Sequence, residues 1–373
     1  MLFVLFIPIV TAHLIQNRVQ YPIIVKAGEE CVEPLNPNDD IELDFYPGDV
    51  VLIQNHLGML LGKIRIWDDV HNSTLIDSEF MRSQLCKDVD TSGKCQEKYC
   101  RQGKGWMMVM CAKTCSVCHL QQKERRCNKT QLGITDNYMV PGFLEKTIQQ
   151  TIEYGGQKIN NVPPIVLFEN FISPDDNEEL LKFAIGSNLK RSTGQGKIDN
   201  NGIQEKKEIH DRTSTNAWCM GKCGRIPAMI RLRKKVSLML GIPENNFEAA
   251  QILRYDEGQL YATHNDIGVL DFKSPAGPRV FTMFVYLNNV EKGGETDFPR
   301  LPNTLVKPRS GQAVLWSSVQ EVNGEFIPDP RTDHQAKPPL NGNVKYGMNI
   351  WVHARAFKIA NIWGCTVSVL FID

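Results

Sequence analysis

The segment Gln251–Asp266, with the sequence QILRYDEGQLYATHND, most constrains what this chain can fold into. It predicts a strand, a turn at residues 256–258, and a second strand that carries His264 and Asp266. Because side chains alternate along a strand, His264 and Asp266 lie on one face and Asn265 lies on the other. A single His-x-Asp triplet arises often by chance, so a metal site needs a third ligand from elsewhere in the chain.

His334 is the candidate for that ligand, because it opens the next stretch suited to a strand. Two histidines and one carboxylate on one face of an octahedron are the ligand set of non-haem Fe(II) oxygenases. This set leaves three coordination positions open, enough for a bidentate 2-oxo acid and for O2. The alternative is that His264 and His334 are ordinary surface or core residues, since the chain has eight histidines.

A strand over Val344–His353 favours the metal site. Its alternation separates a mixed face (Lys345, Gly347, Asn349, Trp351 and His353) from an apolar face (Val344, Tyr346, Met348, Ile350 and Val352). A lysine that points into a cavity needs an anionic partner, because an unpaired buried ammonium is costly. The distal carboxylate of 2-oxoglutarate would supply that charge to Lys345.

Several motifs, in this order along the chain, resemble those of prolyl 4-hydroxylases. They are VLFENFISPDDNEELLKFA at 166–184, RTSTNAWC at 212–219, RYxxGxxYxxHxD at 254–266, YLNNVEKGGETDFP at 286–299, PRSGQAVLW at 308–316 and HQAKPPLNGNVKYGMNIWVH at 334–353. The resemblance covers residues 161–358. It implies a mainly β (α+β) chain with flanking helices and a double-stranded β-helix, or jelly-roll, catalytic domain.

The resemblance also implies an activity. Such enzymes hydroxylate peptidyl proline to 4-hydroxyproline with Fe(II), 2-oxoglutarate and O2, release succinate and CO2, and use L-ascorbate as reductant. The residues carried over are the metal ligands His264, Asp266 and His334, the 2-oxoglutarate anchor Lys345 and its neighbour Tyr255, and the peptide-groove residues Tyr261, Arg279 and Trp351. The chain departs from the family at Gly342-Asn-Val-Lys345-Tyr346, which lengthens the usual G-x-K-W turn by one residue.

The implied partner is a proline-rich or collagen-like polypeptide. Nucleic acid is not expected, because Lys plus Arg and Asp plus Glu both number 42 and no basic run stands out. Two alternatives stay open. One is a dioxygenase that acts on another residue or on a free substrate, and the other is a non-catalytic secreted binding protein with the jelly roll as scaffold.

Six of the eleven cysteines fall between Cys86 and Cys118 and resemble an ShKT module. So short a segment cannot be held by hydrophobic burial, so we expect disulfides. The spacing alone allows fifteen connectivities. The resemblance implies the pairs Cys86–Cys118, Cys95–Cys111 and Cys100–Cys115. The alternative is a metal site built from Cys111, Cys115, Cys118 and His119.

The cysteine density and the apolar residues 2–12 predict the secretory pathway, either the endoplasmic reticulum lumen or secretion. The apolar run lacks a positive flank, and the alternative is a buried N-terminal strand. A retained N-terminal segment would leave membrane association open. Cys219 and Cys223 suit a local disulfide, whereas Cys31, Cys127 and Cys365 stay unassigned.

These features divide the chain into six segments. They are a signal segment (1–18), a β-rich region of unassigned role with strands at 50–54 and 62–67 (19–85), the ShKT module (86–118), a connector (119–160), the dioxygenase domain (161–358) and a C-terminal tail (359–373). Helices are expected at 143–154, after Ser173, and at 226–240. Residues 186–211 are long, polar and glycine-rich, so we expect a loop that acts as a lid over the peptide groove or is a solvated insertion.

Overall fold

The computed structural model describes residues 139–198, 204–268 and 271–366 without further gaps. It also describes shorter stretches before them: 11–16, 23–27, 30–31, 35, 40–45, 50–55, 60–65, 87–90, 93–100, 110–115, 127–132 and 134. The chain forms two compact units. The first holds the residues up to Thr135 together with Ile359–Cys365, and the second holds Asp136–Lys358.

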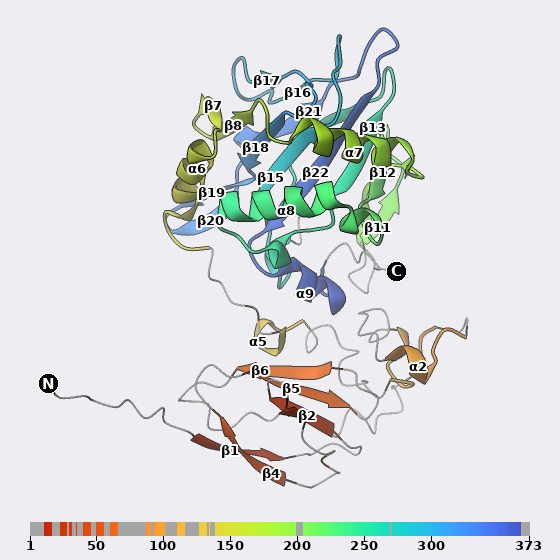
Figure 1. The fold of residues 1–373 in the computed structure, drawn as a ribbon, viewed down its shortest axis with the longest axis vertical. Coiled ribbons are helices and arrows are strands. Elements are labelled where there is room, and N and C mark those ends of the chain that lie inside the picture. Colours follow the sequence, from red (N-terminus) through yellow and green to blue (C-terminus); the bar gives the residue numbers. More distant parts are fainter. Residues whose placement is uncertain are drawn as a thin grey trace, which may run out of the picture. The chain divides into compact units, whose positions relative to one another are not determined.

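The first unit contains two small antiparallel sheets (Figure 1). Strands β1 (Thr11–Gln16) and β4 (Asp40–Phe45) form one, and β3 (Glu30–Cys31), β2 (Ile23–Ala27), β5 (Val50–Asn55) and β6 (Leu60–Arg65) form the other in that order. Strands β5 and β6 match the two strands expected in this region. Strand β1 overlaps the expected signal segment, of which residues 1–10 lie outside the described residues.

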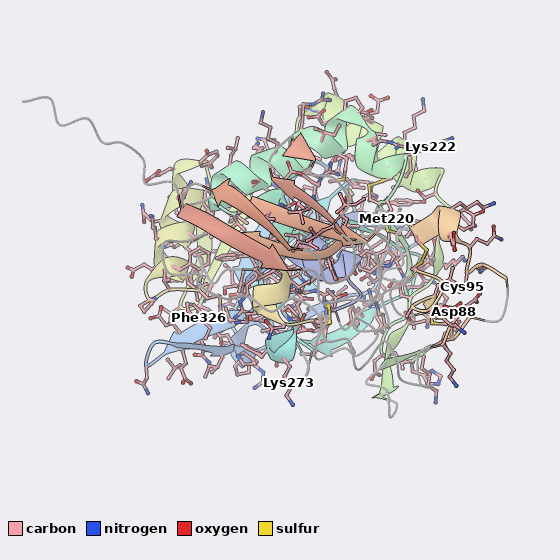
Figure 2. The ribbon with its side chains drawn as sticks, turned by 90° about the horizontal axis from the view of Figure 1, so that it is seen from below. Asp88, Cys95, Met220, Lys222, Lys273 and Phe326 are labelled. Carbon is pink, nitrogen blue, oxygen red and sulfur yellow. A yellow bond between two sulfur atoms is a disulfide. The ribbon has the colours of Figure 1, made fainter. Side chains whose placement is uncertain are left out.

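Disulfides hold the cysteine-rich segment 86–118, which contains the short helix α2 (Glu97–Cys100), and the short helix α5 (Lys129–Leu132) follows it. The structure has Cys95–Cys111 and Cys100–Cys115 bonds, the pairing that the resemblance implies, and Cys95 is labelled in Figure 2. The expected Cys86–Cys118 pair lies outside the described residues. A further bond joins Cys127 to Cys365, 238 residues apart, which the spacing of the cysteines did not indicate.

Two facing sheets form the second unit, which is mainly β with flanking helices, as expected. The larger sheet has the order β7-β8-β18-β15-β22-β13-β12-β9 and the smaller β14-β21-β16-β17. The bounds are β7 Gln157–Asn161, β8 Pro164–Phe168, β9 Lys190–Arg191, β12 Thr215–Trp218, β13 Gln251–Tyr255, β14 Tyr261–His264, β15 Arg279–Tyr286, β16 Thr296–Asp297, β17 Leu305–Val306, β18 Ala313–Ser317, β21 His334–Ala336 and β22 Lys345–His353.

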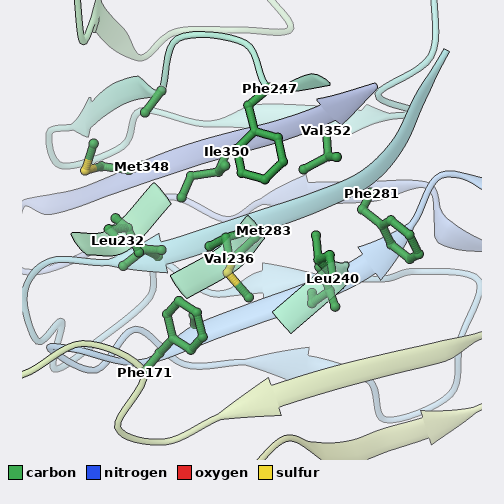
Figure 3. Close-up of a cluster of buried hydrophobic side chains, with 14 of the residues drawn as sticks. Phe171, Leu232, Val236, Leu240, Phe247, Phe281, Met283, Met348, Ile350 and Val352 are labelled. Carbon is green, nitrogen blue, oxygen red and sulfur yellow. The ribbon is translucent and has the colours of Figure 1, made fainter. Parts of the chain in front are cut away.

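Three helices cover one face of the larger sheet (Figure 1): α6 (Phe143–Glu153), α7 (Pro174–Ile185) and α8 (Pro227–Leu240). Helix α7 starts where the sequence indicates, because the Ser173 hydroxyl accepts from the Asp176 backbone N–H at 3.1 Å and Pro174 follows it. Between the helices and the sheet lies the main apolar core, shown in part in Figure 3. Helix α6, which the sequence placed in the connector, packs here through Phe143 and Ile148.

A second apolar cluster lies between the two sheets and includes Tyr255, Phe284, Phe298 and Trp316. The remaining elements are the hairpin β19 (Val319–Val322) and β20 (Glu325–Pro328), the helix α9 (Phe357–Ile362), and the 3-10 helices η2 (Cys223–Arg225), η3 (Glu244–Asn246), η4 (Asp271–Lys273) and η5 (Pro330–Thr332). No helix in the part of the chain that the structure describes is both long and apolar enough to cross a bilayer.

The expectation of one continuous loop over residues 186–211 was wrong. Besides β9, this segment contains an antiparallel hairpin of β10 (Gly194–Ile198) and β11 (Gln204–Lys207). Its polar side chains hid the strand pattern, because a strand that does not border the core needs no apolar alternation. The side chain of Ile209 packs so closely over Gly194 that a Cβ there would lie 2.2 Å from it. Whether the hairpin acts as a lid stays a prediction.

Candidate active site

The paired ends of β14 and β21 bring the three expected metal ligands together. His264 lies directly opposite His334 in the antiparallel pair, and Asp266 follows β14 by two residues. The Nε2 atoms of His264 and His334 lie 3.9 and 3.7 Å from the two carboxylate oxygens of Asp266. One ligand atom from each residue lies within 4.8 Å of the others, so this triad can hold one metal ion.

Hydrogen bonds turn both imidazoles toward that point. Nδ1 of His264 lies 2.8 Å from the Ala262 carbonyl, and Nδ1 of His334 lies 3.1 Å from the Thr332 carbonyl. A carbonyl accepts, so each Nδ1 carries the proton and each Nε2 keeps a lone pair for a metal. Burial, followed by the nearby His334, lowers the pKa of His264 to about 3, so this ring is neutral at physiological pH.

The third ligand is ionised and held from two sides. Burial alone would raise the pKa of Asp266, but His334, His264 and Arg279 outweigh it and the pKa is lowered. The Thr282 hydroxyl donates to Oδ2 of Asp266 at 2.6 Å, and Arg279 donates to its backbone carbonyl at 3.2 Å. Two imidazole nitrogens and one carboxylate suit a divalent transition metal such as Fe(II).

Lys345 is the expected anchor for a carboxylate, and its surroundings fit that role. Its side chain is 0% exposed, and Nζ has no hydrogen-bond partner among the described residues. The rings of Tyr255, Phe284 and Tyr286 surround Nζ, with centroids 5.4, 4.9 and 5.4 Å away. Burial lowers the pKa of Lys345 to about 7, against a smaller opposing effect of Glu295. A buried amine without a hydrogen-bond partner among the described residues is stabilised by an anionic ligand, which would pair with its charge.

Strand register explains how that cage forms. Lys345 pairs directly with Tyr255 across β22 and β13, so the two side chains share the face that looks toward the smaller sheet. Gly347 follows on the same face, where a Cβ would lie 2.4 Å from the Phe284 ring. The glycine therefore lets that ring close over the strand beside the lysine. Tyr255, expected to help hold the cofactor, is buried, and its pKa is raised to about 12 by that burial.

Two of the residues expected to line the peptide groove are aromatic, Tyr261 and Trp351, and their role in the groove stays a prediction. The Tyr261 ring stacks on His264, with centroids 3.5 Å apart, and the Arg212 guanidinium lies 4.5 Å from the Tyr261 ring. Trp351 lies 5.9 Å from Trp218, and the Arg279 guanidinium covers its ring at 3.8 Å. The indole N–H of Trp351 is buried and has no partner among the described residues.

Two important residues escaped the sequence analysis. Glu248 binds Arg279 through both carboxylate oxygens, at 2.6 and 3.1 Å, and lies 2.7 Å from Nε2 of His353. Burial opposes its ionisation, but Arg279 and His353 lower the pKa of Glu248 to about 2. His353 shares a strand face with Lys345, which was a usable signal, whereas nothing local marked Glu248. Arg279 donates its hydrogen bonds to Glu248 and to the Asp266 carbonyl, and its guanidinium packs on the Trp351 ring. It therefore holds Asp266 and Trp351 in position.

The part of the chain that carries the candidate active site is similar to known proteins. Residues 250–353 match the 2OG-Fe(II) oxygenase superfamily. Over 214 residues the chain is 32% identical to a protein named probable prolyl 4-hydroxylase 6 from Arabidopsis thaliana, which covers 52% of this chain and 70% of that protein. This chain belongs to the prolyl 4-hydroxylase family. It is therefore a 2-oxoglutarate-dependent dioxygenase, as its motifs implied.

Two other similarities complete the comparison of this prolyl 4-hydroxylase family member. It is 29% identical over 256 residues to the human prolyl 4-hydroxylase subunit alpha-1, which covers 67% of this chain and 44% of that subunit. The chain thus spans less than half of the human subunit. A crystal structure of viral collagen prolyl hydroxylase from Paramecium Bursaria Chlorella virus-1 with 2OG aligns at 26% identity, covering 51% of this chain and 95% of that one, with a TM-score of 0.40.

Proposed function

We propose that this dioxygenase hydroxylates proline within a polypeptide at C4, and that its substrates are proline-rich or collagen-like. The observation that carries the cofactor assignment is the unpartnered Lys345 amine beside a His-Asp-His triad. The names of the relatives, prolyl 4-hydroxylases, support proline as the residue attacked. The aromatic rings beside the triad, with Tyr261 stacked on His264 and Trp218 next to Trp351, support a polypeptide as substrate.

Each residue then has a defined task. His264, Asp266 and His334 would hold Fe(II), and Lys345 would pair with the distal carboxylate of 2-oxoglutarate, beside Tyr255. When bound, Fe(II) and 2-oxoglutarate would supply the oxidation: one atom of O2 enters a proline C–H bond, and the other enters succinate as CO2 is lost. The apolar cage around Lys345 excludes water from the far end of the cofactor, which strengthens the ion pair.

The surface next to the triad fits an extended peptide. Trp218 and Tyr261 are partly exposed there, Trp351 lies buried beside Trp218, and a row of amide side chains crosses the neighbouring strands. In that row Asn349 donates to Gln251, Gln251 to Asn216, and Asn216 to the Ser192 hydroxyl. Polyproline II segments dock on aromatic grooves and need hydrogen-bond donors for their carbonyls. We propose the buried indole N–H of Trp351, which has no partner among the described residues, as such a donor.

Replacing Trp351 with phenylalanine tests the groove. The ring contacts with Arg279 and Trp218 can persist, but the N–H donor is lost. We expect KM for a proline-rich peptide to rise roughly 2–10-fold, the cost of one hydrogen bond, with KM for 2-oxoglutarate unchanged. Mass spectrometry of the peptide should show one added oxygen atom per modified proline.

The matched control is Tyr346→Phe, because Tyr346 lies on the opposite face of the same strand and should leave both constants unchanged. Oxygen found on lysine instead of proline would retain the dioxygenase and discard the prolyl assignment. Absence of 2-oxoglutarate turnover with every peptide would favour the non-catalytic binding protein.

The low pKa of Lys345, about 7, predicts how 2-oxoglutarate affinity changes with pH. Below pH 7 the free protein already carries the ammonium, so affinity stays constant. Above pH 7 binding must take up a proton, and the dissociation constant should rise toward roughly tenfold per pH unit. Calorimetry at pH 8 in buffers of different ionisation heat measures the uptake. The variant Lys345→Arg stays charged throughout, so a similar proton uptake there would contradict the assignment.

The rest of the chain carries three further proposals. We propose that residues 86–118 form an ShKT module, which the Cys95–Cys111 and Cys100–Cys115 bonds support. The protein acts in the endoplasmic reticulum lumen or is secreted, and disulfides of this density support that compartment. L-ascorbate serves as reductant, which rests on the family alone. Disulfide mapping of the purified protein tests the first two, and free thiols at these positions would contradict both.

A further inference from the structure

The residue between the two ligands of the His-x-Asp motif has a position that its type alone does not explain. Asn265 lies between His264 and Asp266, and strand alternation turns its side chain away from the metal site. There its amide meets the chain that leads to the third ligand. Nδ2 donates to the Asp329 carbonyl at 3.2 Å and to the Asp333 carboxylate at 3.1 Å.

These two acceptors bracket the single turn η5, which ends just before His334. Asp329 caps the start of η5, where its carboxylate accepts from the Arg331 backbone N–H at 3.0 Å. Asp333 follows its end. The Thr332 carbonyl, the last of η5, accepts from Nδ1 of His334 and so fixes the direction of that ring. One amide therefore holds both ends of the turn that orients the third ligand.

Backbone pairing between β14 and β21 does not extend to Asp266, so a side chain must position the segments beyond the pair. The pairing of β14 with β21 is irregular between Tyr261 and His264, and the last paired residues are His264 and His334. Beyond that pair the described backbone ladder stops, yet Asp266 must still be placed against His334. The Oδ1 atom of Asn265 accepts from the Ile267 backbone N–H at 3.1 Å, which fixes the loop on the other side of Asp266.

A third group holds the acceptor in place. The Arg300 guanidinium donates to the second oxygen of Asp333 at 3.0 Å, so both carboxylate oxygens are engaged. Asp333 is largely shielded, with a side chain 16% exposed, whereas Arg300 is 59% exposed. A shielded carboxylate that accepts from a neutral amide and a guanidinium has one defined orientation.

We propose that Asn265 is a positioning residue for the metal centre, which sets the distance and angle between the two histidines by holding η5 through Asp329 and Asp333. This inference rests on the proposed function, because it takes His264, Asp266 and His334 as metal ligands. Outer hydrogen bonds of this kind affect metal affinity about 10–100-fold in other proteins. The proposal is that an amide–carboxylate pair does so here by joining two ligand-bearing segments.

The test measures Co(II) binding to the full chain by calorimetry and by visible absorption, without turnover. The variant Asn265→Leu keeps the side-chain size and loses every hydrogen bond, and Asn265→Asp replaces the donor with a second carboxylate beside Asp333. We expect the Co(II) dissociation constant to rise at least about 10-fold in each, with an altered absorption band. The double variant Asn265→Asp with Asp333→Asn exchanges donor and acceptor in the bond to Asp333 but cannot donate to the Asp329 carbonyl, so it should recover part of the lost affinity.

The control is Thr263→Val, two residues before Asn265. Thr263 is exposed and donates to the side chain of Gln335 on β21 at 3.4 Å, so it makes a similar bond that does not involve η5. Its loss should leave Co(II) binding unchanged, and a melting curve for each variant reports folding. Unchanged affinity in both Asn265 variants, or no recovery in the double variant, would overturn the inference. If the unmodified protein failed to bind Co(II), the proposed function would fall with it.

Discussion

Asp266→Asn should abolish 2-oxoglutarate turnover and weaken Fe(II) or Co(II) binding by more than roughly 100-fold. Asparagine keeps the shape of the side chain and can still accept from the Thr282 hydroxyl, which lies 2.6 Å from the carboxylate. It loses the negative charge that partly neutralises the divalent ion. The carboxylate that carries this charge is one of three candidate protein ligands, so its loss weakens binding strongly. The loss should therefore exceed the about 10–100-fold cost of removing an outer partner. Metal titration by calorimetry measures it.

A carboxylate on the same small sheet provides the control for this variant. Asp297 lies on β16 and accepts from Gln335 at 2.7 Å, with Lys337 nearby at 3.3 Å. Asp297→Asn should leave metal affinity unchanged, because Asp297 is not one of the three candidate ligands and its ion pair with Lys337 is partly exposed to solvent. Retention of turnover by Asp266→Asn would remove this carboxylate from the ligand set. Succinate production, followed together with the melting temperature, separates loss of metal from loss of fold.

Lys345→Met should have two opposite effects. Without its ammonium the protein should lose measurable affinity for 2-oxoglutarate, and turnover should fall to background. The same change should stabilise the free protein, because it removes a buried amine that has no hydrogen-bond partner. Relief of about 1–3 kcal/mol would raise Tm by a few degrees. Methionine is a fitting replacement, since its thioether packs well against the surrounding rings.

The increase in stability of Lys345→Met over the parent protein should depend on pH in a defined direction. Burial lowers the pKa of Lys345 from 10.5 to about 7, so the folded protein disfavours the charged form. The penalty is fully present below pH 7 and disappears as pH rises through 10.5. The Tm difference between variant and parent should therefore shrink toward pH 10. Lys337→Met, at a partly exposed lysine, is the control for both effects. A destabilised Lys345→Met would show that the lysine has a partner within the protein.

Local pattern was sufficient for the parts of the site that lie on single strands. Period-2 alternation placed His264 with Asp266, and Lys345 with Trp351, before any tertiary contact was known. Side-chain direction along a strand is a covalent property of the extended chain, which is why these pairs followed from spacing. The start of α7 at Ser173 was equally local, because a cap acts within one turn.

The groups that support those residues could not be found in this way. Glu248, Arg279 and His353 form one ionic cluster although 105 residues separate its ends. Cys127 pairs with Cys365, and the hairpin within residues 186–211 carries no apolar alternation. Each depends on which segments become neighbours in the fold; for the ionic cluster, the register of β15 against β22 places Arg279 opposite His353.

The sequence by itself therefore determined the family, the mainly β class, and the side chains that form the candidate metal centre and cofactor anchor. The tertiary structure alone decided how they are held. Three rings surround the Lys345 amine, and the Arg279 guanidinium packs on Trp351. His334 follows a turn to which Asn265 donates two hydrogen bonds. The reason is physical. The chain's own geometry fixes the face on which a side chain lies, whereas burial, pKa and orientation come from neighbours that only folding brings close.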